Sequence, residues 1–445
     1  SATAFGQTRT WTGAVSTNWA AAGNWSGNNI PDSAGEIAVI DGLGGSNQPV
    51  LSNSISVGDV VVSAGTLTIN SSLTSNAGLN VSGTANISVG SGGVILGNVN
   101  KSGTGTLTLN SGTITGNLSL GGGVFNRGSG IITGNISMSA GSFNGGTTNF
   151  DAGNIEINGG TFNSTSGNLL IAGNLTGTGG IFDPNGGTVV FGSSTNSLID
   201  HSGTTSFNNL QINKTSSTAT VSIGTGLTKP VSGTLTLTNG QLAGAGILEA
   251  TGPVSVSAFD GGNGNLLVSG GSTRTFTISA PSSGSPAVLP NVTVNAPNTT
   301  VTSTGFGNVS FTGLLLQNVS SVTFGTPISV TSGNAVTNSS GTTLTFNANF
   351  TQSGGTFDAG AGSLDFNGGF TLSNGRFVAS SNNTFASNFT FVVSGGDFDP
   401  NGGTLVFDGT ITNSQSFSVN NLTINSPRGF SSAGTTITIA GTLNL

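Results

Sequence analysis

The sequence GNLSLGGGVFN at residues 116–126 is followed 18 residues later by GNISMSAGSFN at residues 134–144. Both stretches begin with Gly-Asn before an aliphatic residue, and both end with Phe-Asn. Over a longer span the Gly-Asn pair recurs at spacings of 19, 18, 19 and 20 residues, and the Phe recurs at spacings of 18, 19 and 20 residues. Two residue classes that keep one period indicate a structural repeat. The pairs begin at Gly97, Gly116, Gly134, Gly153 and Gly173, and the phenylalanines are Phe125, Phe143, Phe162 and Phe182.

Each repeat has room for three short strands. Apolar and small polar residues alternate in segments such as Thr66–Ile69 and Asn168–Ile171, which predicts half-buried strands. Gly and Asn separate these segments, and both tolerate the left-handed backbone of tight corners. We therefore expect an all-β fold: one long parallel β-helix with three short strands per rung of 19–20 residues and an N-terminal cap. Strands of successive rungs would pair at about 4.8 Å, stacked Asn side chains would form amide ladders, and the chain would contain about 20 rungs.

A longer duplication spans the sequence. Residues 179–191 read GGIFDPNGGTVVF, and residues 395–407, which begin 216 positions later, read GGDFDPNGGTLVF. Each copy leads into a second shared phrase, at residues 207–213 and 419–425, and a third version of that phrase occurs at residues 289–295.

These phrases define the expected domain organisation. Residues 41–445 are predicted to form a continuous solenoid in which residues 179–241 resemble residues 395–445. Phe182 and Phe398 are expected to belong to Phe ladders, and the Asp-Pro-Asn-Gly that follows begins a corner. Residues 245–285 are less regular, so we expect longer loops there.

Residues 1–40 differ from the rest of the chain and contain all three tryptophans, Trp11, Trp19 and Trp25. Solenoids need atypical terminal segments to cover their apolar ends, so this stretch is interpreted as a cap. The alternative is a glycan-binding platform of exposed Trp rings. Residues Ser1–Thr10 form an arm that can add a strand to the edge of another subunit. Ser1-Ala2-Thr3-Ala4 is also compatible with a mature start after removal of a signal peptide.

The composition excludes several classes of function. The chain has 445 residues, 8 Lys+Arg, 15 Asp+Glu and a net charge of −7, and only 5% of its residues are charged. Neutralising phosphates requires clustered cations, so nucleic-acid binding is not expected. No apolar run approaches the roughly 20 residues of a membrane helix. There are no cysteines, while 26 Phe can form a core without disulfides.

Two sets of phrases resemble those of a known class of proteins. They are Trp11-Thr12-Gly13 with Asn18-Trp19 and Asn24-Trp25 near the start, and residues 207–213 with Gly-Thr-Leu-Thr-Leu at residues 233–237. Together they resemble large, secreted, repeat-rich bacterial surface proteins of the adhesin type. The rung length resembles the filamentous-haemagglutinin class of β-helix, which implies a right-handed solenoid and secretion.

Acidic residues are candidate catalytic groups, because some β-helix proteins degrade polysaccharides. Glycoside hydrolysis usually needs paired carboxylates. The densest acidic group is Asp397, Asp399 and Asp408, with Asp183 as the earlier counterpart of Asp399. The Asp-Pro-Asn-Gly context favours a turn, since Pro fixes φ and Gly accepts positive φ. No Lys or Arg is close to these acids in the sequence, which also argues against a lyase.

Two further stretches are candidates for a catalytic or metal-binding site. His201 is the single histidine, which excludes a multi-His metal site, and its polar neighbours predict a solvated turn. The stretch from Asp260 to Asn265 resembles a Gly/Asp-rich calcium turn, but the motif is not iterated, and a plain loop is favoured. The sequence therefore predicts no catalytic, cofactor-binding or metal-binding residues.

The last strand pattern, residues 435–445, has no charged or Pro-rich cover, and an open β-edge invites pairing with another chain. We therefore expect an extracellular structural protein that assembles with itself, head to tail, into a filament, fibre or surface layer through this strand and the N-terminal cap. A cell-surface adhesin that binds surface glycans through the Trp segment or residues 245–285 is the alternative. A polysaccharide-degrading enzyme is less favoured.

Overall fold

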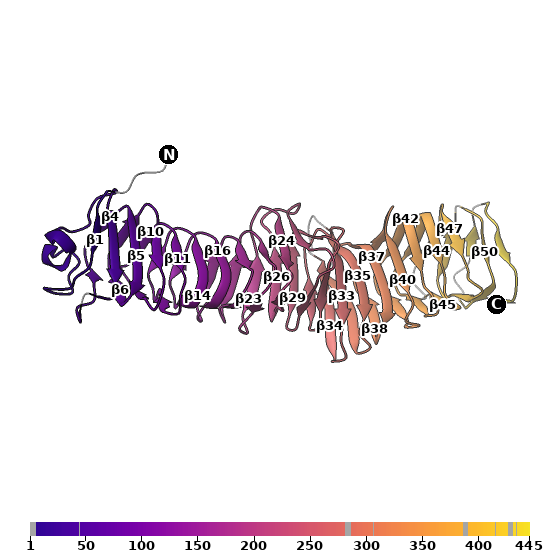
Figure 1. The fold of residues 1–445 in the computed structure, drawn as a ribbon. Coiled ribbons are helices and arrows are strands. Elements are labelled where there is room, and N and C mark those ends of the chain that lie inside the picture. The colour runs from indigo at the N-terminus through magenta and orange to yellow at the C-terminus, as the bar shows by residue number, and fades with distance from the viewer. Residues whose placement is uncertain are drawn as a thin grey trace. The chain divides into compact units, whose positions relative to one another are not determined.

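The computed structural model describes residues 6–43, 45–280, 286–305, 307–385, 390–413, 415–425, 430–432 and 434–445. Its parallel strands stack as a β-solenoid of about 19 turns, which confirms the predicted fold class (Figure 1). The chain divides into two compact units, Ser1–Asn209 and Leu210–Leu445. The boundary near residue 40 and the handedness of the solenoid stay predictions, and Ser1–Phe5 of the expected arm lie outside the described residues.

In the first unit, successive turns contribute strands to three walls. The first wall contains β1 (Thr8–Thr10), β2 (Ile37–Asp41), β5 (Asp59–Ala64), β8 (Leu79–Val81), β11 (Val99–Lys101), β14 (Leu118–Asn126), β16 (Ile136–Asn144), β18 (Ile155–Ile157), β21 (Leu175–Gly177) and β24 (Ser197–His201). The second wall contains β3 (Val50–Leu51), β6 (Thr66–Ile69), β9 (Asn86–Val89), β12 (Thr106–Thr108), the later halves of β14 and β16, β19 (Thr161–Asn163), β22 (Ile181–Asp183) and β25 (Thr204–Thr205).

The third wall is built from two separate ladders. One contains β4 (Ile55–Val57), β7 (Ser72–Ser75), β10 (Val94–Leu96), β13 (Thr113–Ile114) and β15 (Ile131–Ile132). The other begins one turn later with β17 (Phe150–Ala152), β20 (Asn168–Ile171) and β23 (Thr188–Phe191). The strand predicted at residues 168–171 is therefore confirmed.

Both periodic series predicted from the sequence lie in register. The aliphatic residues after each Gly-Asn pair form one column of strand partners, Val99, Leu118, Ile136, Ile155 and Leu175. The Phe column runs through Phe125, Phe143, Phe162 and Phe182. Its rings stack with centroid separations of 5.1, 4.4 and 5.6 Å and interplanar angles of 9°, 3° and 8°.

The expected side-chain amide ladder runs through Asn126, Asn144 and Asn163, whereas the asparagines of the Gly-Asn corners mainly accept backbone N–H groups. The Oδ1 atom of Asn117 accepts the backbone N–H of Asn135 at 2.8 Å, and Asn135 does the same for Asn154, also at 2.8 Å. Asn154 accepts the N–H of Asn174 at 2.8 Å. These side chains bond corner N–H groups to the preceding turn, where the backbone ladder is interrupted.

The second unit contains two long parallel ladders. One includes β29 (Leu235–Asn239), β32 (Val254–Val256), β34 (Arg274–Ala280), β36 (Thr299–Gly305), β38 (Ser321–Phe324), β41 (Leu344–Phe346), β43 (Leu364–Phe366), β45 (Asn382–Phe385), β48 (Thr404–Phe407), β51 (Asn421–Ile424) and β54 (Leu443–Asn444). The other includes β28 (Thr228–Val231), β31 (Ile247–Ala250), β33 (Asn265–Ser269), β35 (Ala287–Asn295), β37 (Val309–Asn318), β39 (Ile328–Val330), β42 (Phe350–Asp358), β44 (Phe370–Val378), β46 (Thr390–Val393), β49 (Thr410–Asn413) and β52 (Phe430–Ser432), and β47 (Asp397–Asp399) pairs with β44.

The Phe ladder expected at Phe398 is also confirmed. Phe357, Phe377 and Phe398 are strand partners, and their rings stack at 4.8 and 5.6 Å. The less regular residues 247–280 carry β31 to β34, and all four strands are paired in parallel with their neighbours. Residues 281–285 of that region lie outside the described residues.

Replacing Phe162 by Ala should lower the free energy of unfolding by about 3–5 kcal/mol, because it leaves a cavity between two stacked rings. Thr161→Ala is the matched control: its side chain lies on the outer face of the same strand, so the change should stay within about 0.5 kcal/mol. Chemical denaturation followed by far-ultraviolet circular dichroism measures both. Equal effects of the two substitutions would contradict the assigned register.

Candidate functional site

The N-terminal segment covers the first complete turn of the solenoid by pairing with two of its walls. On the first wall, Thr8 of β1 pairs with Ile37 of β2. On the second wall, Asn18 forms an isolated parallel bridge with Val50 of β3. The next residue, Trp19, donates its backbone N–H to the carbonyl of Val50 at 3.1 Å.

The three tryptophans form a buried cluster beneath this cover. Trp11, Trp19 and Trp25 are 3%, 1% and 1% exposed. Trp25 packs edge-to-face against Trp11 and Trp19, with centroid separations of 5.1 and 4.6 Å. Rings buried in this way are not available for stacking on a sugar, so the glycan-platform hypothesis has no exposed Trp surface to rest on.

Hydrogen bonds fix the cluster in place. The Nε1 atom of Trp11 donates to the carbonyl of Asn47 at 2.9 Å, and that of Trp25 donates to the carbonyl of Trp19 at 2.7 Å. Asn24 is fully buried, and its Oδ1 accepts the backbone N–H groups of Val15 and Ser16. The Asn-Trp phrase is therefore a folding unit, in which the amide orders the loop that carries the ring.

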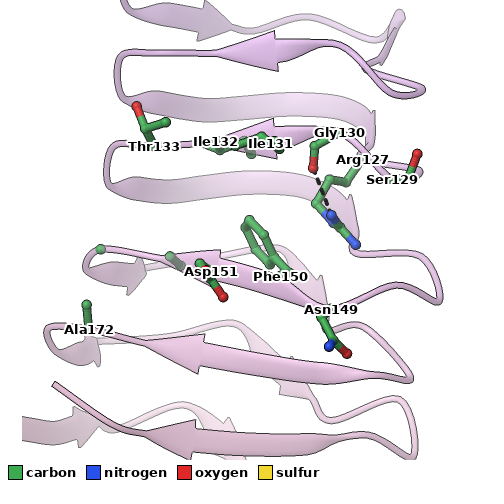
Figure 2. A pocket seen from close by; sticks show the side chains of 12 residues that line it. Arg127, Ser129, Gly130, Ile131, Ile132, Thr133, Asn149, Phe150, Asp151 and Ala172 are labelled. Carbon is green, nitrogen blue, oxygen red and sulfur yellow. Dashed lines mark hydrogen bonds between the residues drawn. The ribbon is translucent and has the colours of Figure 1, made fainter. Parts of the chain in front are cut away.

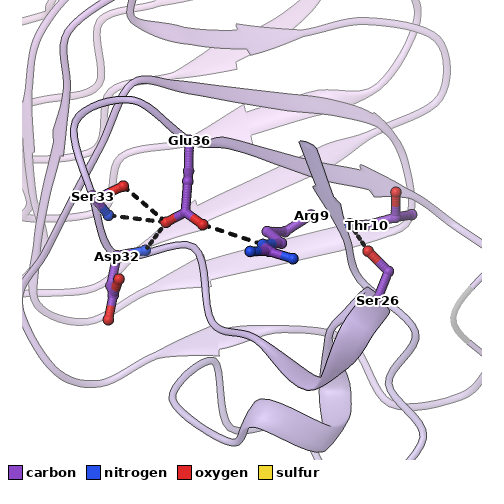
Figure 3. A network of polar contacts seen from close by, with 6 residues as sticks. All are labelled: Arg9, Thr10, Ser26, Asp32, Ser33 and Glu36. Atoms are coloured by element: carbon purple, nitrogen blue, oxygen red, sulfur yellow. Dashed lines mark hydrogen bonds and ion pairs between the residues drawn. The ribbon is translucent and has the colours of Figure 1, made fainter. Parts of the chain in front are cut away.

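A carboxylate ties the start of β1 to the loop before β2 (Figure 3). Glu36 accepts hydrogen bonds from the Nε atom of Arg9 at 3.2 Å, from the backbone N–H of Asp32 at 3.1 Å, and from both the N–H and the hydroxyl of Ser33. Partial burial raises the pKa of Glu36, but these hydrogen bonds and the Arg9 charge outweigh that effect and hold its pKa below the usual 4.5.

The described part of the N-terminal segment does not pair with the third wall of the solenoid. Strand β4 pairs with β7, and no other described strand pairs with its opposite edge. A groove of about 280 Å³ lies at this edge, lined by Ser54, Ile55 and Ser56 together with Trp19 and others. The remaining lining residues are Asn18, Ala20, Ile30, Asp32, Leu51, Ser52 and Asn53.

Trp19, one of the residues that line this groove, contains an unsatisfied donor. Its Nε1 atom is buried and has no hydrogen-bond partner among the described residues. A buried donor without an acceptor costs roughly 1–3 kcal/mol. The sequence marked Trp19 as a candidate but gave no sign that its N–H lacks a partner, because this depends on which loop carbonyl reaches it.

The opposite edge of the same ladder borders a second groove, of about 490 Å³, between β15 and β17 (Figure 2). Here the ladder breaks, since β15 pairs with β13 and β17 pairs with β20. Arg127 fills the break: its guanidinium donates to the carbonyls of Gly130 and Gly145 and to Thr148, all within 2.8 Å, and lies 4.7 Å from the centroid of the Phe150 ring. Burial lowers the pKa of Arg127.

Arg127 therefore replaces hydrogen bonds that the strand ladder lacks at this break. Other basic residues are buried as well. Five of the eight Lys and Arg residues are at most 5% exposed. Burial also lowers the pKa of Lys101 and Arg274, and it lowers that of Lys214 to about 8. These cations are not on the surface, and the absence of nucleic-acid binding stays a prediction. The five are Lys101, Arg127, Lys214, Lys229 and Arg274.

The repeated Asp-Pro-Asn-Gly phrases form the predicted turns. Asp183 accepts the backbone N–H of Asn185 at 2.8 Å, and Asp399 accepts that of Asn401 at 3.0 Å. Both asparagines are left-handed, with φ of 49° and 46°. Each turn is bonded to the second repeated phrase one turn later, through Asn208 to Gly186 and Asn420 to Gly402, so the two phrases recur together because they touch.

No Lys or Arg is close to Asp397 and Asp399 in the sequence, but one is close to them in the structure. Arg376 of β44 pairs with Asp397 of β47, and its Nη2 atom lies 2.8 Å from Asp399. Its Nε atom is 3.8 Å from Asp397. Arg376 and Asp397 are more than half exposed, so this ion pair contributes little to stability. Asp408 follows β48, in the other ladder of this unit, and is half-buried.

The prediction that His201 lies in a solvated turn is wrong. His201 ends β24 and is 0% exposed. Its Nε2 lies 2.7 Å from the carbonyl of Gly179 and its Nδ1 lies 2.5 Å from the hydroxyl of Thr205. Side chains alternate along a strand, and His201 shares the inward face of Ile199, two residues earlier. Strand parity therefore decided its environment, and its polar neighbours did not.

The stretch from Asp260 to Asn265 connects strands. Asp260 bridges to Val288 and accepts the N–H of Gly240, and although that hydrogen bond opposes it, burial raises the pKa of Asp260. Within the described residues, no three His, Asp or Glu side chains are grouped as metal ligands. The same residues contain no helix that is long and apolar enough to cross a membrane.

The chain matches no model of a protein family, no curated protein and no solved structure.

Trp25→Phe and Trp19→Phe form a matched pair that tests the two indole N–H groups. Both remove similar volume, but Trp25→Phe also leaves the Trp19 carbonyl without its donor, whereas Trp19→Phe removes a donor that has no partner. We expect Trp25→Phe to be about 1–2 kcal/mol more destabilising. Denaturation followed by Trp fluorescence reports on this segment alone, because all three tryptophans lie in it. Equal losses would contradict the assigned hydrogen bond.

The Glu36 network predicts a pH dependence of the same segment. A folded-state pKa held below the usual 4.5 contributes stability above that pH, and this contribution is lost as the pH falls through the folded-state value. Unfolding of the Trp cluster should therefore occur more easily at pH 3 than at pH 7. Glu36→Gln should unfold more easily at pH 7 and should show less difference between the two pH values. Asp32→Asn, which keeps the backbone donor, is the control, and a Glu36→Gln variant with wild-type pH dependence would disprove the assignment.

Proposed function

We propose that this protein is an extracellular structural protein, a solenoid subunit that associates end to end with further copies into a filament, fibre or surface layer. The observation that carries the proposal is the common register of the inward aliphatic and Phe columns over residues 97–182. Stacked Phe rings, aliphatic columns and Asn ladders all run along the axis, so each turn is bonded to the next by backbone, side chains and core together.

Such a stack resists local opening, because displacing one turn breaks strand pairs on more than one wall. The surface supports the same proposal. Ser, Thr, Asn and Gly replace the usual charged residues on it, which lowers electrostatic repulsion between copies. A function in transport, signalling or catalysis has no comparable feature to support it in the described residues.

Self-association and location test the proposal. Sedimentation velocity over a hundredfold range of protein concentration should show species larger than the monomer that grow with concentration. Negative-stain microscopy should show them as linear or sheet-like assemblies, and antibody labelling of intact cells should place the protein outside the cell. Monomers at every concentration would contradict the assembly, and labelling only after permeabilisation would contradict the location.

A further inference from the structure

The unpaired edge of β4 is a docking surface. We infer that this edge, with the groove beside it, binds an extended segment from a second copy of this chain, which adds a parallel strand to the β4–β7–β10–β13–β15 ladder. The inference rests on the proposed self-association and specifies where it occurs.

The backbone of β4 offers the first half of the contact. The carbonyl of Val57 accepts the N–H of Asn76, on the side of β7. Because the N–H and C=O of consecutive residues in a strand point to opposite sides, those of Ser56 face the unpaired edge. Residues 30–32 do not supply the missing strand: Ile30 and Asp32 line the groove, and Pro31 between them has no N–H to donate.

Trp19 offers the second half. Its indole N–H is the only cap Trp donor without an acceptor in the described residues, since those of Trp11 and Trp25 are bonded to carbonyls. An added strand brings a row of carbonyl groups to the groove that Trp19 lines. The Nε1 atom is buried in the isolated chain, so the indole has to turn toward the groove before one of these carbonyls accepts its N–H and removes the cost of the unpaired donor.

The column of inward side chains in this ladder predicts the residue pattern of the added strand. Leu73, Ile95, Ile114 and Ile132 are strand partners along this ladder and are at most 1% exposed. Ile55 is the partner of Leu73 at the end of the column, and it is only half-buried. The incoming strand therefore carries an apolar residue above Ile55, with small polar residues on either side.

The residue pattern of this chain favours a second copy as the occupant of the groove. Asp32 is the one charged residue among those that line it, so an acidic segment is disfavoured. Strands of this chain alternate apolar with Ser, Thr or Asn, and 5% of its residues are charged. A second copy thus supplies strands with both the pattern and the neutrality that the edge requires.

Paired substitutions at Ser56 test the inference. Ser56→Pro removes the N–H at the unpaired edge, a position where Pro is tolerated in an edge strand, while Ser56→Ala keeps that N–H. We expect Ser56→Ala to associate like the wild type and Ser56→Pro to lose association at least tenfold, measured by sedimentation velocity with circular dichroism as the folding check. Trp19→Phe, which keeps an aromatic ring but no donor, should also weaken association and serves if Ser56→Pro does not fold.

Hydrogen exchange of the full chain separates the possible occupants. Exchange of the Ser56 amide should slow as the protein concentration rises into the range of association. Protection that is independent of concentration would mean that the chain's own residues 1–5 or another segment cover the edge, which overturns the inference. Association that persists in Ser56→Pro and Trp19→Phe would overturn the inference alone, and no association in the wild type would overturn it together with the proposed function.

Discussion

The hydrogen bonds between successive turns are the constraint on which this structure depends. Each strand is only two to ten residues long, and it has no partner within its own turn. Its backbone groups are satisfied only if the next turn places a strand beside it in register. A shift of one residue would turn every inward side chain outward. This requirement explains why the Phe column and the aliphatic column keep a common period over residues 97–182, although the sequence between them varies.

The same constraint explains the irregular features of the first unit. Where β15 and β17 fail to pair, polar backbone groups are exposed beside the core. The structure places a buried arginine there, and its fork of donors reaches carbonyls of two turns at once. Asn side chains serve a similar purpose at the corners, where an amide oxygen accepts the N–H group of the following turn. At these two kinds of position, charged and amide side chains therefore make hydrogen bonds that the backbone ladder lacks.

The fold could be predicted from the sequence because successive turns repeat the same order of strands and corners along the chain. The Phe series, the Gly-Asn corners and the strand at residues 168–171 all lie where their period predicts. The alternation of inward and outward side chains along a strand also predicts which polar residues are buried, but two of these residues were missed. Lys101 stands two residues after Val99 and is buried like it, and His201 follows Ile199 in the same way. Reading strand parity ahead of local polarity would have found both.

Contacts across turns with unequal loops could not be predicted in this way. Arg376 meets Asp397 and Asp399 because β44 and β47 are adjacent, although these residues are 21 and 23 positions apart. Likewise, nothing in the Trp phrases indicates which indole N–H remains without an acceptor. The repeat period predicts which side chains point into the core of a solenoid. Whether a given indole N–H or strand edge finds a partner depends instead on the loops around it. An unpaired edge offers free backbone donors and acceptors to a partner, and β4, beside the groove that Trp19 lines, is such an edge in the first unit.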